Sequence, residues 1–512
     1  MAPENGSSAY LHRPLVPKPG SDSPFTTVSD VGPINTSRDF LRMEFLVECK
    51  KLWLLAGPAI FNTLCQYSLG AITQTFAGHL GDLELAAFSI ENSVIDGFSF
   101  GIMLGMGSAL ETLCGQAYGA GQLDMLGVYM QRSWVILDTT GLILSLLYIF
   151  AKPLLRLIGQ KEEIADMAGM FSIWMLPQLF AYAMNFPIAK FLQSQSKMMV
   201  MAAISAVALG LHTLLSWVLM FKLKWGLVGA AVMLNASWWF IVVAQLVYIF
   251  SGTCGRAWSG FTWRAFHNLW GFVKLSIASA VMLCLEVWYL MALILIAGYL
   301  KNPEISVDAL SICMNISGWT LMVALGYNAA TSIRVSNELG AGNPRSAKFA
   351  IVVVVINSFI VGLILALILV TFRKEYPTAF TNSEVVRKLV ANLTPLLAFS
   401  IVINSVQPIL TGISKIRMKI LPQIRGTRSF SKLMLIQAIK THSHFLMKSG
   451  AAVGAGRQAL VAYVNIGCYY IFGVPLGLLL GCVFNYGVQA SVAEDRIRTW
   501  GGEPDAKETM NE

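Results

Sequence analysis

A glutamate stands near the middle of a long apolar stretch between about residues 270 and 298. No Lys or Arg accompanies Glu286 between Lys274 and Lys301. An ionised carboxylate in such surroundings costs on the order of 3 kcal/mol, so the acids found there usually serve a function. Because a carboxyl group can bind and release a proton, Glu286 is our first candidate for a proton carrier. The alternative is a protonated glutamate that only hydrogen-bonds a neighbouring helix.

Three acids share a second apolar stretch, residues 86–113: Glu91, Asp96 and Glu111. Asp96 lies near its middle and is a candidate for a substrate or cavity residue. Three neighbours could instead satisfy its carboxylate without any transport role: Asn92, Ser93 and Ser99. Glu111 lies near the end of the stretch, where water makes a charge less costly, so we interpret it as structural.

Uncharged polar and aromatic residues complete the set of candidates. Asn315 follows Asp308 by two helical turns on the same face, and it could bind Glu286, a substrate or another helix. The other candidates for a substrate cavity are Trp288, Tyr289, Asn404 and Gln407. The eight cysteines contain no CxxC motif, and we expect neither a metal site nor a cofactor.

The stretches that carry these residues are long enough to cross a membrane. Of the 512 residues, 55% are hydrophobic and 13% charged, which is unusual for a soluble domain of this size. Stretches of about 20 apolar residues span a hydrocarbon core, and they must be helical because unpaired backbone groups are too costly in lipid. Eleven such stretches lie near 51–78, 86–113, 125–150, 165–187, 198–221, 227–250, 270–298, 307–333, 347–371, 388–412 and 457–482. The predicted fold class is an all-α polytopic membrane protein.

An internal duplication arranges these stretches in two halves. Gly119-Ala120-Gly121 returns as Gly340-Ala341-Gly342, a shift of 340 − 119 = 221 residues. Three further segments return at similar spacing: 77–80 at 297–300, 87–90 at 309–312 and 176–179 at 394–397. Such duplications are typical of two-lobed secondary transporters. A shift of 220 places Gln66 opposite Glu286, so one lobe can carry a proton where its mate can only hydrogen-bond.

The duplication also suggests how the chain divides. We expect a disordered cytosolic tail at 1–43, because this segment is polar and has no apolar core typical of a signal peptide. An N-lobe of six spans at 44–255 precedes a C-lobe of five spans at 256–489. A polar tail follows at 490–512.

The C-lobe departs from the N-lobe in two places. A basic insert occupies 413–450, and it holds eight Lys or Arg residues and no acid, against a formal net charge of +9 for the chain. We expect it to be an exposed cytosolic loop on anionic lipid. After Gly487 the chain becomes too charged to span, so the expected twelfth span is missing. Either this is an eleven-span protein with a loop, or the chain is a splice or gene-model variant.

Several motifs resemble those of plant multidrug and toxic compound extrusion (MATE) transporters of the detoxification branch. They are MGSALETLCGQAYGA at 106–120, QRSW at 131–134, FLQSQ at 191–195, CLEVWY at 284–289 and RVSNELG at 334–340. The resemblance covers about residues 45–412 and 451–489. It implies two six-helix lobes, of which this chain has six plus five spans.

The resemblance also implies an activity. The family exports organic solutes such as flavonoid-like secondary metabolites or xenobiotics from the cytosol, in plants usually in exchange for protons. It implies that Glu286 is the coupling carboxylate. Some relatives add an Asp in the tenth span, where this chain has Asn404 and Gln407 instead.

The expected partners are a small organic substrate, protons and membrane lipids, with no nucleic acid, and we expect a monomer in the vacuolar or plasma membrane. No Walker A loop is present, so we expect the chain to draw its energy from an ion gradient or to act passively, and the resemblance implies a proton gradient.

Three alternatives stay open. A lipid-linked flippase of the same superfamily would need a cationic cavity, and the spans hold few Lys or Arg. A membrane enzyme would need clustered His or carboxylates at one membrane face, and the six His are scattered. The third alternative is a transport-inactive variant that lacks its twelfth span.

Overall fold

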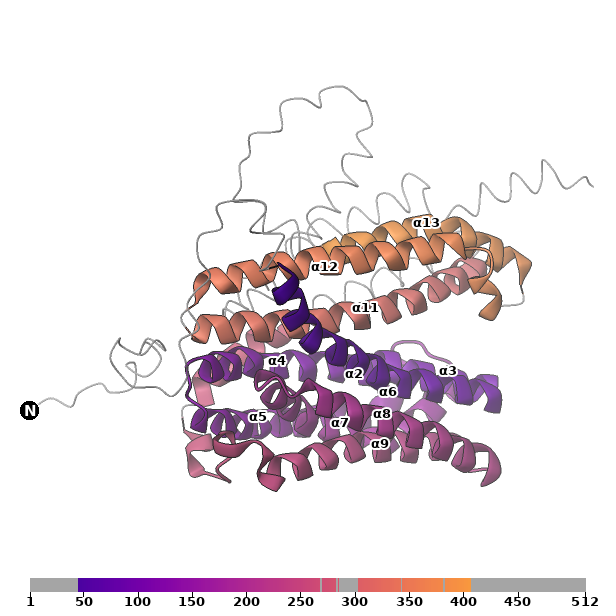
Figure 1. Ribbon diagram of the computed structural model, residues 1–512. Coiled ribbons are helices and arrows are strands. Elements are labelled where there is room, and N and C mark those ends of the chain that lie inside the picture. The colour runs from indigo at the N-terminus through magenta and orange to yellow at the C-terminus, as the bar shows by residue number, and fades with distance from the viewer. Residues whose placement is uncertain are drawn as a thin grey trace, which may run out of the picture.

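The computed structural model describes residues 45–267, 269–281, 284, 303–341, 343–380 and 383–406. The regular structure of these residues is entirely helical (Figure 1). The longer helices are α2 (Phe45–Leu80), α3 (Asp82–Ile90), α4 (Gly97–Gly119), α5 (Asp124–Ile149), α6 (Ala151–Leu157), α7 (Glu162–Ser194), α8 (Met198–Trp217), α9 (Gly226–Tyr248), α11 (Pro303–Gly340), α12 (Pro344–Thr371) and α13 (Glu384–Val406). Short π or 3-10 segments are η2 (Glu91–Asp96), η3 (Val218–Lys222), η4 (Ile249–Thr253), η5 (Gly255–Ala257), η6 (Trp263–Phe266) and η7 (Tyr376–Ala379).

The predicted membrane spans correspond to helices wherever the structure describes them. Seven segments of the described residues are long and apolar enough to cross a membrane. The stretches predicted at 51–78 and 307–333 lie in α2 and α11, which have 36 and 38 residues but are not among these seven. The stretch at 270–298 is helical over Leu269–Val281 in its described part. The predicted span at 457–482, the insert at 413–450 and both tails lie outside the described residues.

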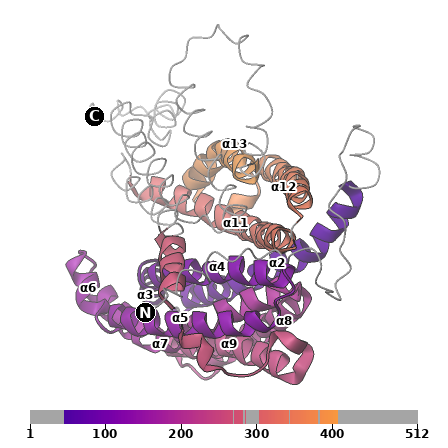
Figure 2. The ribbon, with the colours of Figure 1, turned by 90° about the vertical axis from the view of Figure 1, so that its left-hand side faces the viewer.

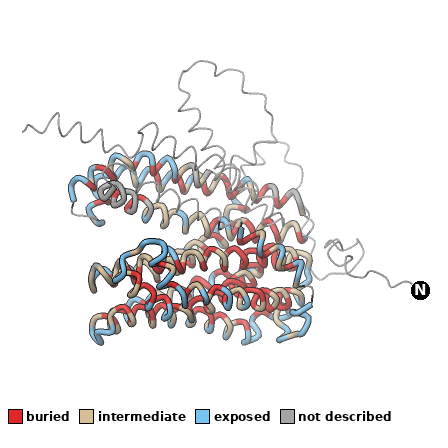
Figure 3. The backbone as a smooth tube through the Cα atoms, turned by 180° about the vertical axis from the view of Figure 1, so that it is seen from behind, coloured by how far each residue is buried: buried red, intermediate tan, exposed pale blue. Residues whose placement is uncertain are grey.

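Two groups of helices form the molecule. Helices α2 to α9 make the N-lobe, and α11, α12 and α13 lie together on one side of it (Figures 1 and 2). The largest hydrophobic core lies inside the N-lobe, where buried residues line the facing sides of α4, α5, α7 and α9 (Figure 3). It includes Phe88, Phe171 and Phe191, each 1% exposed or less.

Helix α2 belongs to both groups. Leu52 and Ala56 in its first half share a core with Tyr327 of α11 and Val353 of α12. Its second half contributes Leu69 and Ala77 to the N-lobe core. Pro58 lies between these halves, and a proline inside a membrane helix is tolerated because neighbouring groups satisfy the freed backbone carbonyl.

The repeated Gly-Ala-Gly step ends a helix. After α4, Gly121 has φ 73°, a left-handed conformation that glycine adopts without strain. Its N–H donates to the Tyr118 carbonyl and the next N–H, of Gln122, donates to the Ala117 carbonyl, which closes the helix end. Because α11 ends at Gly340, the second copy of the step also marks a helix end.

Candidate functional site

The two lobes contact each other where α4 and α11 end. A side chain added at Gly119 would collide with the Asn337 carbonyl, and one at Gly340 would collide with the Gln116 carbonyl. One turn earlier, Gly115 faces the Ser336 hydroxyl in the same way. Small residues spaced four apart let the backbones of two membrane helices approach closely. The duplicated step therefore serves as the contact surface between the lobes, which we call the lobe contact (Gly115, Gly119, Ser336 and Gly340).

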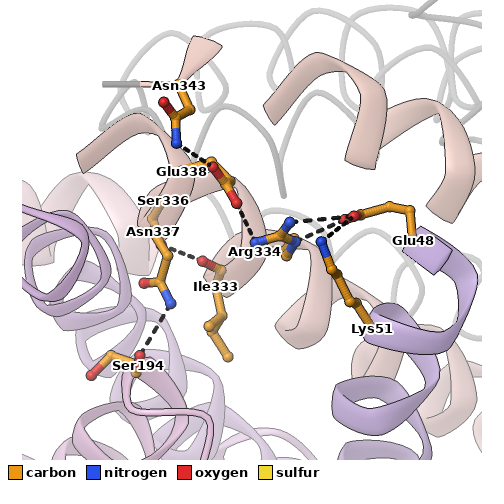
Figure 4. A network of polar contacts seen from close by, with 9 residues as sticks. All are labelled: Glu48, Lys51, Ser194, Ile333, Arg334, Ser336, Asn337, Glu338 and Asn343. Carbon is orange, nitrogen blue, oxygen red and sulfur yellow. Dashed lines mark hydrogen bonds and ion pairs between the residues drawn. The ribbon is translucent and has the colours of Figure 1, made fainter. Parts of the chain in front are cut away.

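A network of charges surrounds the lobe contact (Figure 4). Arg334 of α11 donates from Nε to Glu48 Oε1 of α2 at 2.8 Å and from Nη2 to Glu48 Oε2 at 3.3 Å. Its Nη1 donates to Glu338, and Asn343 donates to the other Glu338 oxygen at 3.1 Å. The side chains of Arg334, Glu48 and Glu338 are 19%, 9% and 14% exposed. One guanidinium thus bridges two nearly buried acids on two helices, the geometry that arginine provides better than lysine.

A third connection runs from α11 to α7. Asn337 Nδ2 donates to the Ser194 carbonyl at 3.2 Å, at the end of α7 (Figure 4). Two motifs identified in the sequence, FLQSQ and RVSNELG, therefore meet in space. They tie the ends of α2, α7 and α11 together at the lobe contact, whereas the two helix groups diverge toward the opposite end (Figures 1 and 3).

Helices α2 and α11 cross farther along their length. Thr63 Oγ1 donates to the Met322 carbonyl at 2.9 Å, and the rings of Tyr67 and Trp319 meet edge to face at 5.2 Å. Gln66 lies beside Tyr67 in α2, and its buried Nε2 has no hydrogen-bond partner among the described residues. Asn315 lies one turn before Trp319 and is exposed. The structure thus places two predicted cavity residues, Gln66 and Asn315, along one helix crossing between the lobes.

Asp96 lies elsewhere, inside the N-lobe. It is 8% exposed and ends the π-helical segment η2. The Tyr148 hydroxyl of α5 donates to Asp96 Oδ1 at 3.3 Å, and the Tyr182 hydroxyl of α7 is 3.5 Å from Oδ2. Gln178 donates to the Tyr182 hydroxyl from the preceding turn of α7. Three helices therefore converge on one carboxylate.

The predicted partners of Asp96 were wrong. Asn92 and Ser93 are exposed, Ser99 is buried, and the described hydrogen bonds to the carboxylate come from the two tyrosines rather than from these three neighbours in sequence. The reason is that η2 is a π-helix, with a wider turn than an α-helix, so α-helical spacing misplaces the side chains around it. Glu111 is 6% exposed and pairs with Lys190 at 2.5 Å, in agreement with a structural role.

The remaining predicted residues are not tested by the geometry. Glu286, Trp288, Tyr289 and Gln407 lie outside the described residues. Asn404 belongs to α13, and its side chain is outside the description. The helix Leu269–Val281 packs closely on α4, since a side chain at Gly105 would collide with Ala280 and Gly101 lies next to Cys284.

Sequence reasoning missed the tyrosines around Asp96 and the partners of Arg334. Tyr148 and Tyr182 are separated from Asp96 by 52 and 86 residues, and Glu48 is separated from Arg334 by 286. No local pattern links such positions. Only the RVSNELG motif pointed to Arg334, and it did so without naming a partner.

Comparisons with known proteins agree with this geometry. The MatE family model matches residues 58–218 and 278–422. Protein DETOXIFICATION 29 of Arabidopsis thaliana is 60% identical over 512 residues, covering 94% of this chain and 95% of that protein. Protein DETOXIFICATION 30 of the same plant is also 60% identical, over 509 residues and 94% of each chain.

The fold also matches solved structures. The crystal structure of the eukaryotic MATE transporter AtDTX14 superposes with a TM-score of 0.76 at 32% identity, covering 87% of this chain and 91% of that one. The Vibrio cholerae MATE transporter VcmN D35N mutant, at 16% identity and a TM-score of 0.63, shows the same fold. The chain therefore belongs to the MATE family of multidrug and toxin efflux proteins, and it is an integral membrane transporter rather than an enzyme.

Proposed function

We propose that this chain is a secondary active antiporter that exports flavonoid-like secondary metabolites or xenobiotics from the cytosol in exchange for protons. The proposal includes Glu286 as the coupling carboxylate and the vacuolar or plasma membrane as the place of action. It treats the transporter as a monomer that needs no cofactor beyond the proton gradient.

The observation that carries this proposal is that the two lobes pack backbone against backbone at one end and diverge toward the other, with α2 and α11 crossing between them (Figure 1). Gly119 and Gly340 join the lobes there, and the charge network of Arg334 and Glu48 spans the same end. Two helical groups joined at one end and apart at the other can alternate the side on which a binding site opens. Such a cycle needs an energy source, and ion-binding acids inside the spans can supply it.

The helix crossing of α2 and α11 supports an aromatic organic substrate. Tyr67 and Trp319 meet there, Trp319 is 39% exposed, and the Gln66 amide N–H has no partner within the part of the chain that the structure describes. Exposed aromatic faces bind flat solutes, and an unpaired amide can donate to a phenolic or glycosidic oxygen.

Reconstituted proteoliposomes test this proposal. We expect an imposed pH gradient to drive the uptake of a flavonoid glucoside or of ethidium, and an ionophore that dissipates the gradient to abolish it. Glu286→Gln should remove the dependence on the gradient while leaving expression intact. If the pH gradient does not change the transport rate of the wild-type chain, proton antiport is refuted. If Glu286→Gln transports at the wild-type rate under the gradient, the assignment of Glu286 as the coupling carboxylate is refuted.

A further inference from the structure

Two acids in the N-lobe are buried at the two ends of η2, and no ion pair of the described residues includes either of them. Glu91 begins η2 and Asp96 ends it, and the side chains are 1% and 8% exposed. A π-helix has i to i+5 hydrogen bonds, so residues five apart lie near one another along the same side. Single π-helical turns inside α-helices are often found at functional sites. The wider turn here brings both carboxyl groups into the same part of the lobe.

The pair has more acceptors than donors. The two tyrosine hydroxyls serve Asp96, while Glu91 Oε1 is buried with no hydrogen-bond partner among the described residues. Gln178 donates its N–H to the Tyr182 hydroxyl, and its own side-chain carbonyl oxygen is buried with no partner in the described ranges. Buried acceptors without donors are rare because each one costs free energy. A proton on either carboxyl would supply the missing donor.

No cation compensates the pair within the described residues. The titratable groups that face it are Tyr148 from α5 and Tyr182 from α7. Lys190 of α7 pairs with Glu111, and Lys152 of α6 pairs with Asp166. Glu91 and Asp96 therefore differ from the buried carboxylates Glu48 and Glu111, each of which forms an ion pair with a cation.

The packing favours a proton over a metal cation. The Tyr182 ring meets Trp238 at 4.8 Å, Phe100 at 5.3 Å and Phe186 at 5.8 Å. A metal ion needs several converging oxygen ligands and room between them. A proton needs one acceptor and no additional volume.

We propose that Glu91 and Asp96 form a proton-binding site in the N-lobe, separate from Glu286 in the C-lobe. This proposal rests on the proton antiport inferred above. Helix α4 begins directly after Asp96 and ends at Gly119 of the lobe contact. A proton bound at η2 changes the charge at one end of α4, and the other end of that helix joins the lobes. The site thereby couples proton occupancy to the separation of the lobes.

Infrared difference spectroscopy of the purified chain tests the site without requiring transport. A buried carboxyl group that gains a proton gives a carbonyl band as the pH falls between about 8 and 5. We expect this band to lose intensity in Asp96→Asn and in Glu91→Gln, and to lose more in the double variant. The matched control is Asp138→Asn, which removes a half-buried acid of α5. In this variant the part of the band that comes from Glu91 and Asp96 should remain. An unchanged spectrum in the folded double variant would overturn the proposal, as would a band that responds to Na⁺ at constant pH.

Proteoliposome transport then tests coupling. Asp96→Asn should reduce the stimulation of export by a pH gradient about tenfold, within the range typical for coupling between two sites. Tyr148→Phe should shift the midpoint of the pH profile, because it removes a hydroxyl that donates to Asp96 Oδ1. If a pH gradient does not stimulate wild-type transport, the proposal of proton antiport is wrong. The infrared result then still shows whether Glu91 and Asp96 bind a proton. If wild-type transport follows the gradient and the Asp96→Asn variant responds equally, the role in coupling is wrong.

Discussion

Two pairs of buried acids in this molecule have opposite surroundings. Glu48 and Glu338 share the guanidinium of Arg334 beside the lobe contact. Inside the N-lobe, Asp96 accepts only from two neutral tyrosine hydroxyls, and Glu91 Oε1 has no hydrogen-bond partner among the described residues. A guanidinium that donates hydrogen bonds to acids on two helices joins those helices, so the first pair is suited to hold helices together. An acid pair without a cation can change its charge with a proton, so the second pair is suited to respond to a gradient.

The sharpest contrast comes from removing Arg334. Arg334→Ala leaves nearly buried Glu338 without its cation and leaves Glu48 only its longer ion pair with Lys51, at 3.7 Å. Breaking a buried ion pair in this way costs about 3 to 5 kcal/mol. We expect a large loss of thermal stability, measured by the retention of monodisperse protein after heating. The triple variant with Glu48→Gln and Glu338→Gln should recover part of the loss. A wild-type melting temperature in Arg334→Ala would show that the network does not hold the lobes.

A more conservative change separates geometry from charge. Arg334→Lys keeps the positive charge but cannot donate to both acids in the same fork, and losing one charge-assisted hydrogen bond costs about 1.5 to 3 kcal/mol. We expect a melting temperature between those of wild type and Arg334→Ala. Equal stability of the Lys variant and wild type would mean that charge alone suffices.

Packing at the same end can be tested without touching a charge. Gly119→Val places a branched side chain against the Asn337 backbone, and overpacking of this kind costs about 1 to 3 kcal/mol. We expect lower stability and impaired transport, because the lobes can no longer close at this end. Gly210→Val is the control, since nothing lies within 4 Å of a side chain added there. Equal effects of both substitutions would point to helix propensity rather than to the lobe contact.

The smallest effect on stability is expected from the second acid pair. Asp96→Asn leaves no opposite charge without a partner. Its amide oxygen still accepts from one tyrosine hydroxyl and its amide nitrogen can donate to the other, so the free energy of unfolding should change by less than about 1 kcal/mol. The same melting assay measures it. A loss comparable to that of Arg334→Ala would mean that Asp96 is a structural anchor, and the contrast between the two pairs would disappear.

The sequence predicted the helical fold and the duplication, because apolar length and repeated residues are local properties. It even indicated the two glycine steps, Gly119 and Gly340, that meet in space. It did not predict the role of Arg334, since Glu48 lies 286 residues away. It misplaced the partners of Asp96 because the π-helical turn of η2 has no recognisable sequence signature. Long-range pairings and local helix irregularities depend on tertiary packing, which spacing along one chain cannot reveal.

The position of α2 across both groups of helices has a consequence for how the chain is made. Leu52 shares its core with Tyr327, which is synthesised 327 − 52 = 275 residues later. At the usual 5 to 20 residues per second, the first half of α2 therefore waits roughly 14 to 55 s for its partner. Its second half meets the N-lobe helices much sooner. The earliest of the described helices to leave the ribosome is thus among the last to complete its packing, and its exposed apolar face needs lipid or a chaperone in the interval.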